Sequence, residues 1–142
     1  MPSSLYAAWA HQLRGDRAAA RAAFDSARVF LDSLIKELPD DYRVHWARGL
    51  ALAGLGRLAE ARREARWLQQ LVSYREDATL GAWLADGRAR ILAHAGDADE
   101  ALDQIERVLA RPSWLSVNTL RIDPTWDPIR SHPRFERLVA GK

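Results

Sequence analysis

A short string that begins with glycine returns three times along the chain at a nearly constant spacing. It reads GDRAAA at residues 15–20, GRLAEA at 56–61 and GDADEA at 96–101. The copies therefore start 41 and 40 residues apart, from 15 to 56 and from 56 to 96. Self-similarity with a fixed period in this range is the sequence signature of a repeat architecture, in which one supersecondary unit stacks on the next.

The segments on both sides of each copy have helical character. Those upstream are rich in alanine and free of proline, as in LYAAWAHQLR and AWLADGRARILAHA. Those downstream carry apolar residues at spacings of three and four, and the first such stripe is Phe24, Ala27, Phe30, Leu31, Leu34 and Ile35. The glycine suits a left-handed helix C-terminus, Asp16 and Asp97 suit N-caps, and Asp97 with Glu100 has the spacing of a capping box. Each unit is predicted to be a helix, a tight turn and a second helix.

Proline and polar clusters separate the units, namely LPDD at 38–41, SYRED at 73–77 and RPSW at 111–114. No alternating β-branched run long enough for a strand is present in the sequence. We therefore expect an all-α fold, an α-α superhelix (solenoid) of about three helical hairpins in a single domain spanning 1–142. The expected repeats lie at about 3–39, 40–73 and 77–111, with a C-terminal capping segment at about 113–140.

Fixed positions around the turn resemble those of the tetratricopeptide repeat (TPR) family, whose unit is a pair of antiparallel helices. The turn glycine is followed five residues later by alanine, in the pairs Gly15 and Ala20, Gly56 and Ala61, and Gly96 and Ala101. A small residue stands seven places before each glycine: Ala8, Gly49 and Ala89. The units exceed the usual length of about 34 residues. We expect an extended second helix in the first unit and a longer loop after the second.

The tail has a different sequence character, LRIDPTWDPIRSHPRF at 120–135, in which cap-forming residues precede prolines. Its apolar residues are predicted to cover the exposed end of the last repeat, as a solenoid requires: Trp126, Ile129, Phe135, Leu138 and Val139. Repeats joined to such a tail resemble the C-terminal TPR regions of bacterial signalling proteins, where they follow a nucleotide cyclase, a serine/threonine kinase or a winged-helix regulator. The chain is then either an excised domain or a freestanding relative.

Charge and apolar patterning argue against several classes of partner. The chain has 21 basic and 19 acidic residues, and the two signs are interspersed rather than gathered into one basic face. No apolar segment approaches the length of a membrane span. We therefore expect no nucleic-acid partner, no membrane association and a cytoplasmic location.

Motifs for catalysis and for metal or cofactor binding are incomplete. Residues 54–59 match a dinucleotide-binding glycine pattern, but no strand is predicted before them. The four histidines form no i, i+4 pair, and the sequence holds no cysteine. We predict that the protein is not an enzyme and uses no cofactor or metal.

In the TPR family the first helix of each unit lines the concave face. Counting from the turn glycines, this resemblance implies a protein-binding groove formed by Leu5, Trp9, Gln12, Arg43, Trp46, Leu50, Trp83, Asp86 and Arg90. Tryptophan and arginine are enriched in binding hot spots. In the alternative interpretation, the tryptophans fill space between units or lie beneath the tail. On the groove interpretation Arg90 is an exposed flank, whose charge reversal should change stability by no more than about 0.5 kcal/mol.

The function favoured by these patterns is a non-catalytic scaffold that binds a peptide or partner protein through the concave face. Two alternatives stay open. One is self-assembly into a homo-oligomer through exposed apolar surface, and the other is a regulatory or sensor domain of a bacterial signalling protein.

Overall fold

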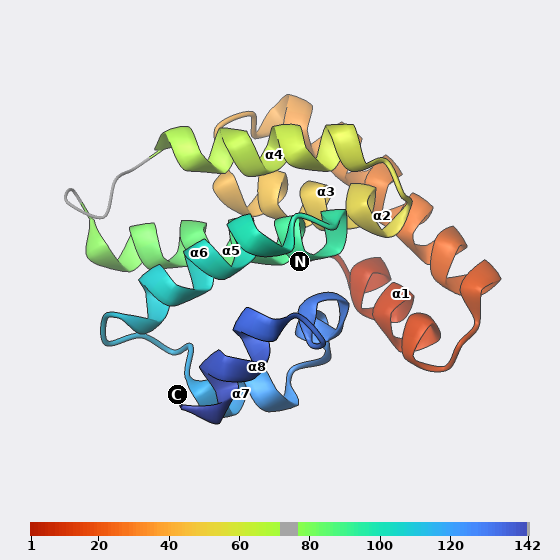
Figure 1. Cartoon of the computed structure of the whole chain (residues 1–142). Coiled ribbons are helices and arrows are strands. Elements are labelled where there is room, and N and C mark those ends of the chain that lie inside the picture. The colour runs from red at the N-terminus through yellow and green to blue at the C-terminus, as the bar shows by residue number, and fades with distance from the viewer. Residues whose placement is uncertain (72–76, 142) are drawn as a thin grey trace.

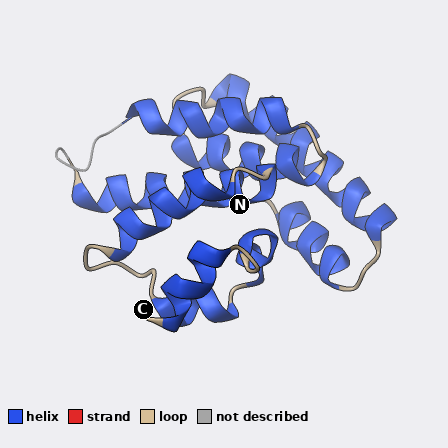
Figure 2. Ribbon diagram, in the orientation of Figure 1, coloured by secondary structure: helices blue, strands red, loops and turns tan. Residues whose placement is uncertain are grey.

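The protein is described by a computed structural model, which covers residues 1–71 and 77–141. The described residues form helices and no strand, so the predicted all-α fold is confirmed (Figures 1 and 2). The helices are α1 (Ser3–Leu13), α2 (Arg17–Glu37), α3 (Tyr42–Gly54), α4 (Leu58–Leu71), α5 (Ala78–Ala95), α6 (Ala98–Leu109), α7 (Val117–Ile122), the 3-10 helix η1 (Pro124–Ile129) and α8 (Pro133–Ala140).

Six of these helices form three consecutive hairpins. Helix α1 packs on α2, α3 on α4, and α5 on α6. The hairpins stack because α2 packs on α3, α4 packs on α5, and the first helices α3 and α5 also contact each other. This arrangement is the expected superhelix of three helical units (Figure 1).

The repeated string marks the turn inside each hairpin. Its glycine adopts a left-handed backbone conformation in all three copies, with φ of 78°, 76° and 87° at Gly15, Gly56 and Gly96. In each turn the backbone N–H after the glycine donates to the carbonyl five residues earlier, at 3.0, 2.9 and 2.9 Å. That pairing closes the first helix and frees the chain to begin the second. The repeated string therefore ends the first helix of each hairpin, through the backbone conformation of its glycine and the hydrogen bond that follows it.

The N-caps that follow the glycines differ from one another. Asp16 caps α2 by accepting a hydrogen bond from the Ala19 N–H at 3.0 Å. Asp97 makes no such bond, and its carboxylate instead accepts two bonds from Arg62 at 2.6 and 2.9 Å. The predicted capping box of Asp97 and Glu100 is wrong, because the charged guanidinium of α4 outcompetes a backbone amide for this carboxylate.

The first hairpin has an extended second helix, as expected. Helix α2 has 21 residues, whereas α4 and α6 have 14 and 12. Its predicted apolar stripe is buried or half-buried except for Phe30, which lies exposed on the outer surface. The longer loop expected after the second unit, with most of SYRED, falls on residues 72–76, outside the described residues.

A partly buried polar cluster joins α2, α3 and α4. Arg48 donates to Asp32 at 2.7 Å and also to Glu64. Glu64 in turn is bonded to His45 Nδ1 at 2.6 Å, and the His45 ring stacks on Trp67 with centroids 3.4 Å apart. Because a buried charge is costly unless it is paired, the bond from Arg48 compensates the burial of the Glu64 carboxylate.

The tail, residues 111–141, folds back along the third hairpin. The 3-10 helix η1 packs on α5, and α7 packs on α8. Trp126, Ile129 and Phe135 are buried in the common core, and Leu138 and Val139 pack against it, so the predicted capping surface forms. Arg134 of α8 also binds three carboxylates of α6, those of Asp99, Asp103 and Glu106.

Close helix packing at the repeated alanines leads to a first prediction. Ala101 is fully buried at the start of α6. Ala101→Leu is expected to lower the free energy of unfolding by about 1 to 3 kcal/mol, because the added methyl groups have no free volume to enter. Urea denaturation measures the change. Ala22→Leu, at an exposed position of α2, is the control, and equal midpoints for the two variants would contradict the packing argument.

Candidate functional site

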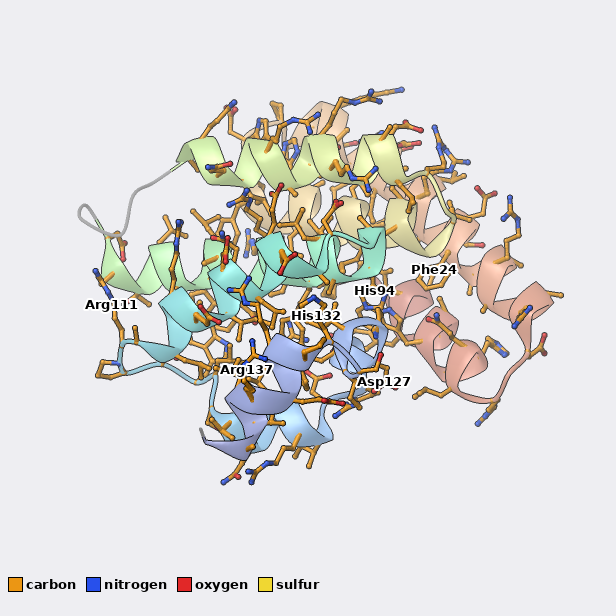
Figure 3. All side chains as sticks on the ribbon, viewed as in Figure 1. Phe24, His94, Arg111, Asp127, His132 and Arg137 are labelled. Carbon is orange, nitrogen blue, oxygen red and sulfur yellow. The ribbon has the colours of Figure 1, made fainter. Side chains whose placement is uncertain are left out.

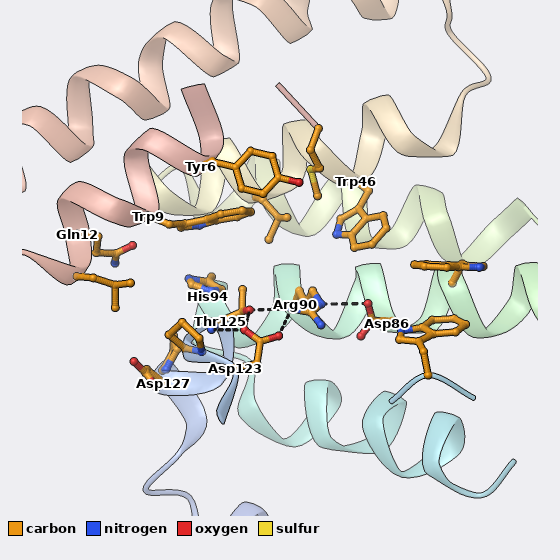
Figure 4. Close-up of a pocket in the computed structure, with 17 residues that line it drawn as sticks. Tyr6, Trp9, Gln12, Trp46, Asp86, Arg90, His94, Asp123, Thr125 and Asp127 are labelled. Carbon is orange, nitrogen blue, oxygen red and sulfur yellow. Dashed lines mark hydrogen bonds and ion pairs between the residues drawn. The ribbon is translucent and has the colours of Figure 1, made fainter. Parts of the chain in front are cut away.

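A pocket of about 850 Å³ lies where the first helices of the three hairpins face the tail (Figure 4). Helices α1, α3 and α5 form its walls on the side of the repeats. The tail closes the opposite side. The lining residues are Met1, Tyr6, Trp9, Gln12, Leu13, Trp46, Leu50, Trp83, Asp86, Arg90, His94, Trp114, Asp123, Pro124, Thr125, Asp127 and Pro128.

Aromatic rings dominate the lining. Trp83 of α5 stacks on Trp114 of the tail with ring centroids 3.9 Å apart, and Trp46 lies 6.3 Å from Trp83 at a tilt of 50°. Tyr6 and Trp9 form an edge-to-face pair at 5.7 Å on the α1 wall. Trp83 is 38% exposed, so part of its ring remains open to solvent. Large rings with two torsions each offer contact area at a small loss of conformational entropy.

Arg90 organises the polar side of the pocket. Its Nε donates to Asp86 Oδ2 at 3.0 Å, and its Nη1 donates to Asp123 Oδ2 at 2.9 Å and to Thr125 Oγ1 at 2.7 Å. The guanidinium carbon lies 4.7 Å from the centroid of the Trp126 ring. One arginine on α5 therefore holds a carboxylate of its own helix and two groups at the start of η1.

Burial shifts the ionisation of the acids and the histidine around Arg90. It raises the pKa of Asp86, and the neighbouring Arg90 only partly opposes that effect. Burial also raises the pKa of Asp123, but hydrogen bonds from Thr125 and Arg90 outweigh it and bring the pKa below the usual value. Burial lowers the pKa of His94, so its ring is neutral at pH 7.

Three buried polar atoms of this lining have no hydrogen-bond partner among residues 1–71 and 77–141. They are Asp86 Oδ1, Trp46 Nε1 and His94 Nε2. Figure 3 shows His94 near Asp127, another residue of the lining, between the third hairpin and the tail. Unsatisfied buried polar groups are few in folded proteins, and each one needs an explanation. Three of the five such atoms among the described residues thus belong to one pocket, which makes it the candidate binding site.

Seven of the nine residues predicted for the groove line this pocket. They are Trp9, Gln12, Trp46, Leu50, Trp83, Asp86 and Arg90. Leu5 is wrong as a groove residue, because its side chain is buried in the core between the helices. Arg43 lies outside the lining, with a side chain 71% exposed and bound to Asp41 at 2.6 Å. Trp9, Trp46 and Trp83 line the pocket, and Trp9 and Trp46 also pack against the core, so both interpretations of the tryptophans stay open.

The expected exposure of Arg90 is also wrong. Its side chain is 16% exposed, and its partner Asp86 is 2% exposed. Counting from the turn glycine located the correct face of α5, but it could not show that the tail covers that face. Arg90 is therefore part of the structure that holds the tail in place.

Sequence reasoning missed the tail's share of the pocket. His94 lies one turn after Arg90 on the same helix, so the spacing of 86, 90 and 94 could have identified it. Trp114, Asp123 and Thr125 carry no comparable signal. Their position depends on how a segment without repeat periodicity folds back over α5.

The described residues contain neither a cluster placed to bind a metal ion nor a helix suited to cross a membrane. In residues 1–71 and 77–141, no group of three or more His, Cys, Asp or Glu side chains is placed to bind a metal ion. Among the helices of those ranges, none has both the length and the apolar character that crossing a bilayer requires.

Comparison with known families agrees with the architecture. A family model for the tetratricopeptide repeat matches residues 3–26, 42–67 and 82–107. Each matched segment begins in the first helix of a hairpin and ends in the second. Searches of curated proteins and of solved structures found no match, so the resemblance of the tail to bacterial signalling proteins stays a prediction. The repeats of this family mediate protein–protein interaction and typically form non-catalytic scaffolds. With more than half of its length matched in three units, the chain belongs to the tetratricopeptide repeat family.

Proposed function

We propose that this protein is a non-catalytic interaction module that binds a segment of a partner protein in the pocket between α1, α3, α5 and the tail. The observation that carries the proposal is the aromatic lining together with its three unpartnered buried polar atoms. A peptide has both apolar side chains for the rings and backbone groups for those atoms. No catalytic step is assigned to the site.

The size and chemistry of the pocket favour a chain segment over a flat protein surface. A space of about 850 Å³ accommodates a few amino-acid side chains rather than a whole domain. The repeat family supplies the same expectation, because its members use helical arrays as scaffolds for other proteins. The tail narrows the groove to one pocket, so we expect recognition of a short anchor rather than of a long helix.

A peptide-display selection on the full chain tests this proposal. Selected peptides are then measured by calorimetry against the parent protein and against Trp83→Ala, which removes a half-exposed ring of the lining. We expect Trp83→Ala to weaken binding by about 30-fold, as loss of a hot-spot tryptophan does. Phe30→Ala removes an exposed ring on the outer face of α2 and should bind as the parent does. If Phe30→Ala weakens binding and Trp83→Ala does not, or if the selection yields no binding peptide, the pocket is not the binding site.

Self-assembly is a second candidate, favoured by exposed apolar side chains on the first hairpin. Val29 and Phe30 stand side by side in the sequence of α2, and both are more than half exposed. A second copy could cover them by an isologous contact. Sedimentation equilibrium over a hundredfold concentration range tests this candidate. A constant monomer mass would eliminate it.

A further inference from the structure

The acidic side chains of the pocket lining outnumber the guanidinium groups that pair with them. The Asp86 and Asp123 carboxylates share a single guanidinium, that of Arg90. Asp127 also lines the pocket, but Arg130 lies 2.8 Å from it and balances its charge. His94 adds no positive charge at pH 7, because burial lowers its pKa. Among these side chains, three carboxylates are therefore paired with two guanidinium groups.

The carboxylate oxygen that lacks a donor belongs to Asp86. Asp86 is almost completely buried, and its Oδ2 accepts the bond from Arg90 while its Oδ1 has no partner. In Figure 4 this carboxylate lies between Arg90 and the tryptophan side of the pocket. A buried carboxylate oxygen without a donor is unfavourable, and burial accordingly raises the pKa of Asp86. A donor that is itself charged would compensate most fully.

The walls beside Asp86 also suit a cation. Trp46, Trp83 and Trp114 line the same pocket as Asp86, and tryptophan has the aromatic face that attracts ammonium and guanidinium groups best. The chain already shows the same preference internally, since the Arg90 guanidinium lies over Trp126. A carboxylate and several tryptophan rings in one pocket are groups that attract organic cations.

A second unpartnered atom indicates that the cation belongs to a peptide. Trp46 Nε1 is a donor only, so it needs an acceptor such as a backbone carbonyl. A lysine or arginine residue within a chain carries both a cationic end and a nearby carbonyl. A free inorganic cation would satisfy Asp86 and leave Trp46 without a partner.

We infer that the pocket binds a lysine or arginine side chain of the partner segment, with its cationic group at Asp86 Oδ1 among the tryptophans and a backbone carbonyl at Trp46 Nε1. This inference rests on the proposed function and adds the chemistry of the anchor residue. It assigns Asp86 as the residue that determines specificity. Arg90 fixes the position of that carboxylate.

The test uses four blocked amino acids as probes. Nα-acetyl-lysine and Nα-acetyl-arginine N-methylamides carry the cation, and the norleucine and citrulline analogues are their neutral counterparts of similar shape. Binding to the full-length protein is followed by tryptophan fluorescence and by NMR titration. We expect the two cations to bind at least about tenfold more tightly than their neutral counterparts, because only they can pair with a buried carboxylate.

Two variants connect that preference to Asp86. Asp86→Asn keeps an oxygen that can accept the Arg90 bond but removes the negative charge, and it should bind charged and neutral probes equally. Asp40→Asn makes the same change on the exposed loop between α2 and α3 and should keep the tenfold preference. Thermal melting of both variants shows whether the fold is intact. Loss of the preference in an Asp86→Asn protein that still melts cooperatively supports the inference, and a preserved preference overturns it.

The outcomes separate this inference from the proposed function. Equal binding of charged and neutral probes to the parent, or no binding of any probe, overturns the cation anchor. Display-selected peptides that depend on Trp83 but contain no lysine or arginine also overturn it, and they leave the proposed peptide site standing. Peptides that bind independently of Trp83 contradict the proposed function itself.

Discussion

Arg90→Glu is expected to lower the free energy of unfolding by at least about 3 kcal/mol, which is the scale of breaking a buried ion pair. The parent guanidinium joins Asp86 on α5 to Asp123 and Thr125 at the start of η1. A carboxylate in its place would put three negative groups together where one is almost fully buried. Chemical denaturation with far-ultraviolet circular dichroism measures the loss.

Two further variants isolate the cause of that loss. Arg43→Glu reverses an exposed arginine with a single carboxylate partner, and its expected change is within about 1 kcal/mol. The double variant Arg90→Met with Asp86→Leu removes the buried charges as a pair and should recover much of the stability of the parent. If Arg90→Glu unfolds at the same denaturant concentration as Arg43→Glu, the tail is not held by this arginine.

Trp126→Ala should destabilise the protein by about 3 to 5 kcal/mol, the range for removing a buried aromatic side chain. Trp126 is one of the largest fully buried side chains among the described residues, and it lies under the Arg90 guanidinium. Its loss leaves a cavity between η1 and the repeats and removes a favourable surface for that cation. For a chain of this size the melting temperature should fall by about 10 °C or more.

The matched control is another tryptophan of the tail. Trp114 is partly exposed and stacks on Trp83, so Trp114→Ala removes mainly one aromatic pair, of about 1 kcal/mol. Differential scanning calorimetry compares the two variants directly. A larger loss of stability for Trp114→Ala than for Trp126→Ala would mean that Trp126 does not anchor η1 in the core.

The parts of the fold that sequence predicted correctly depend on local chemistry. In the third hairpin Gly96 has a positive φ at the turn and Ala101 is buried five residues later, where the two helices pack, so these two residues marked the turn in the sequence. The N-cap prediction for Asp97 failed because a residue distant in the sequence competes with the local backbone amide for its carboxylate. Asp97 had the sequence context of an N-cap, but Arg62 reaches it from the preceding hairpin.

In the candidate site, too, local spacing predicted one part and could not predict the other. Helical spacing from the glycines identified the face of Trp46, Trp83 and Asp86, because positions on a helix follow from its period. It could not identify the tail as the opposite wall, since nothing in a non-repeating segment fixes where it folds back. The consequence was largest for Arg90, which has the position of a groove residue and the environment of a core residue.

Each junction along the array is joined by a different arginine. Arg48 of α3 binds Asp32 of α2, Arg62 of α4 binds Asp97 before α6, and Arg90 of α5 binds Asp123 before η1. The three arginines stand at different places within their hairpins, so one hairpin cannot replace another without separating a cation from its acid. This chain therefore encodes the order and the number of its units, and duplicating or exchanging a hairpin would produce mismatched neighbours rather than a longer array.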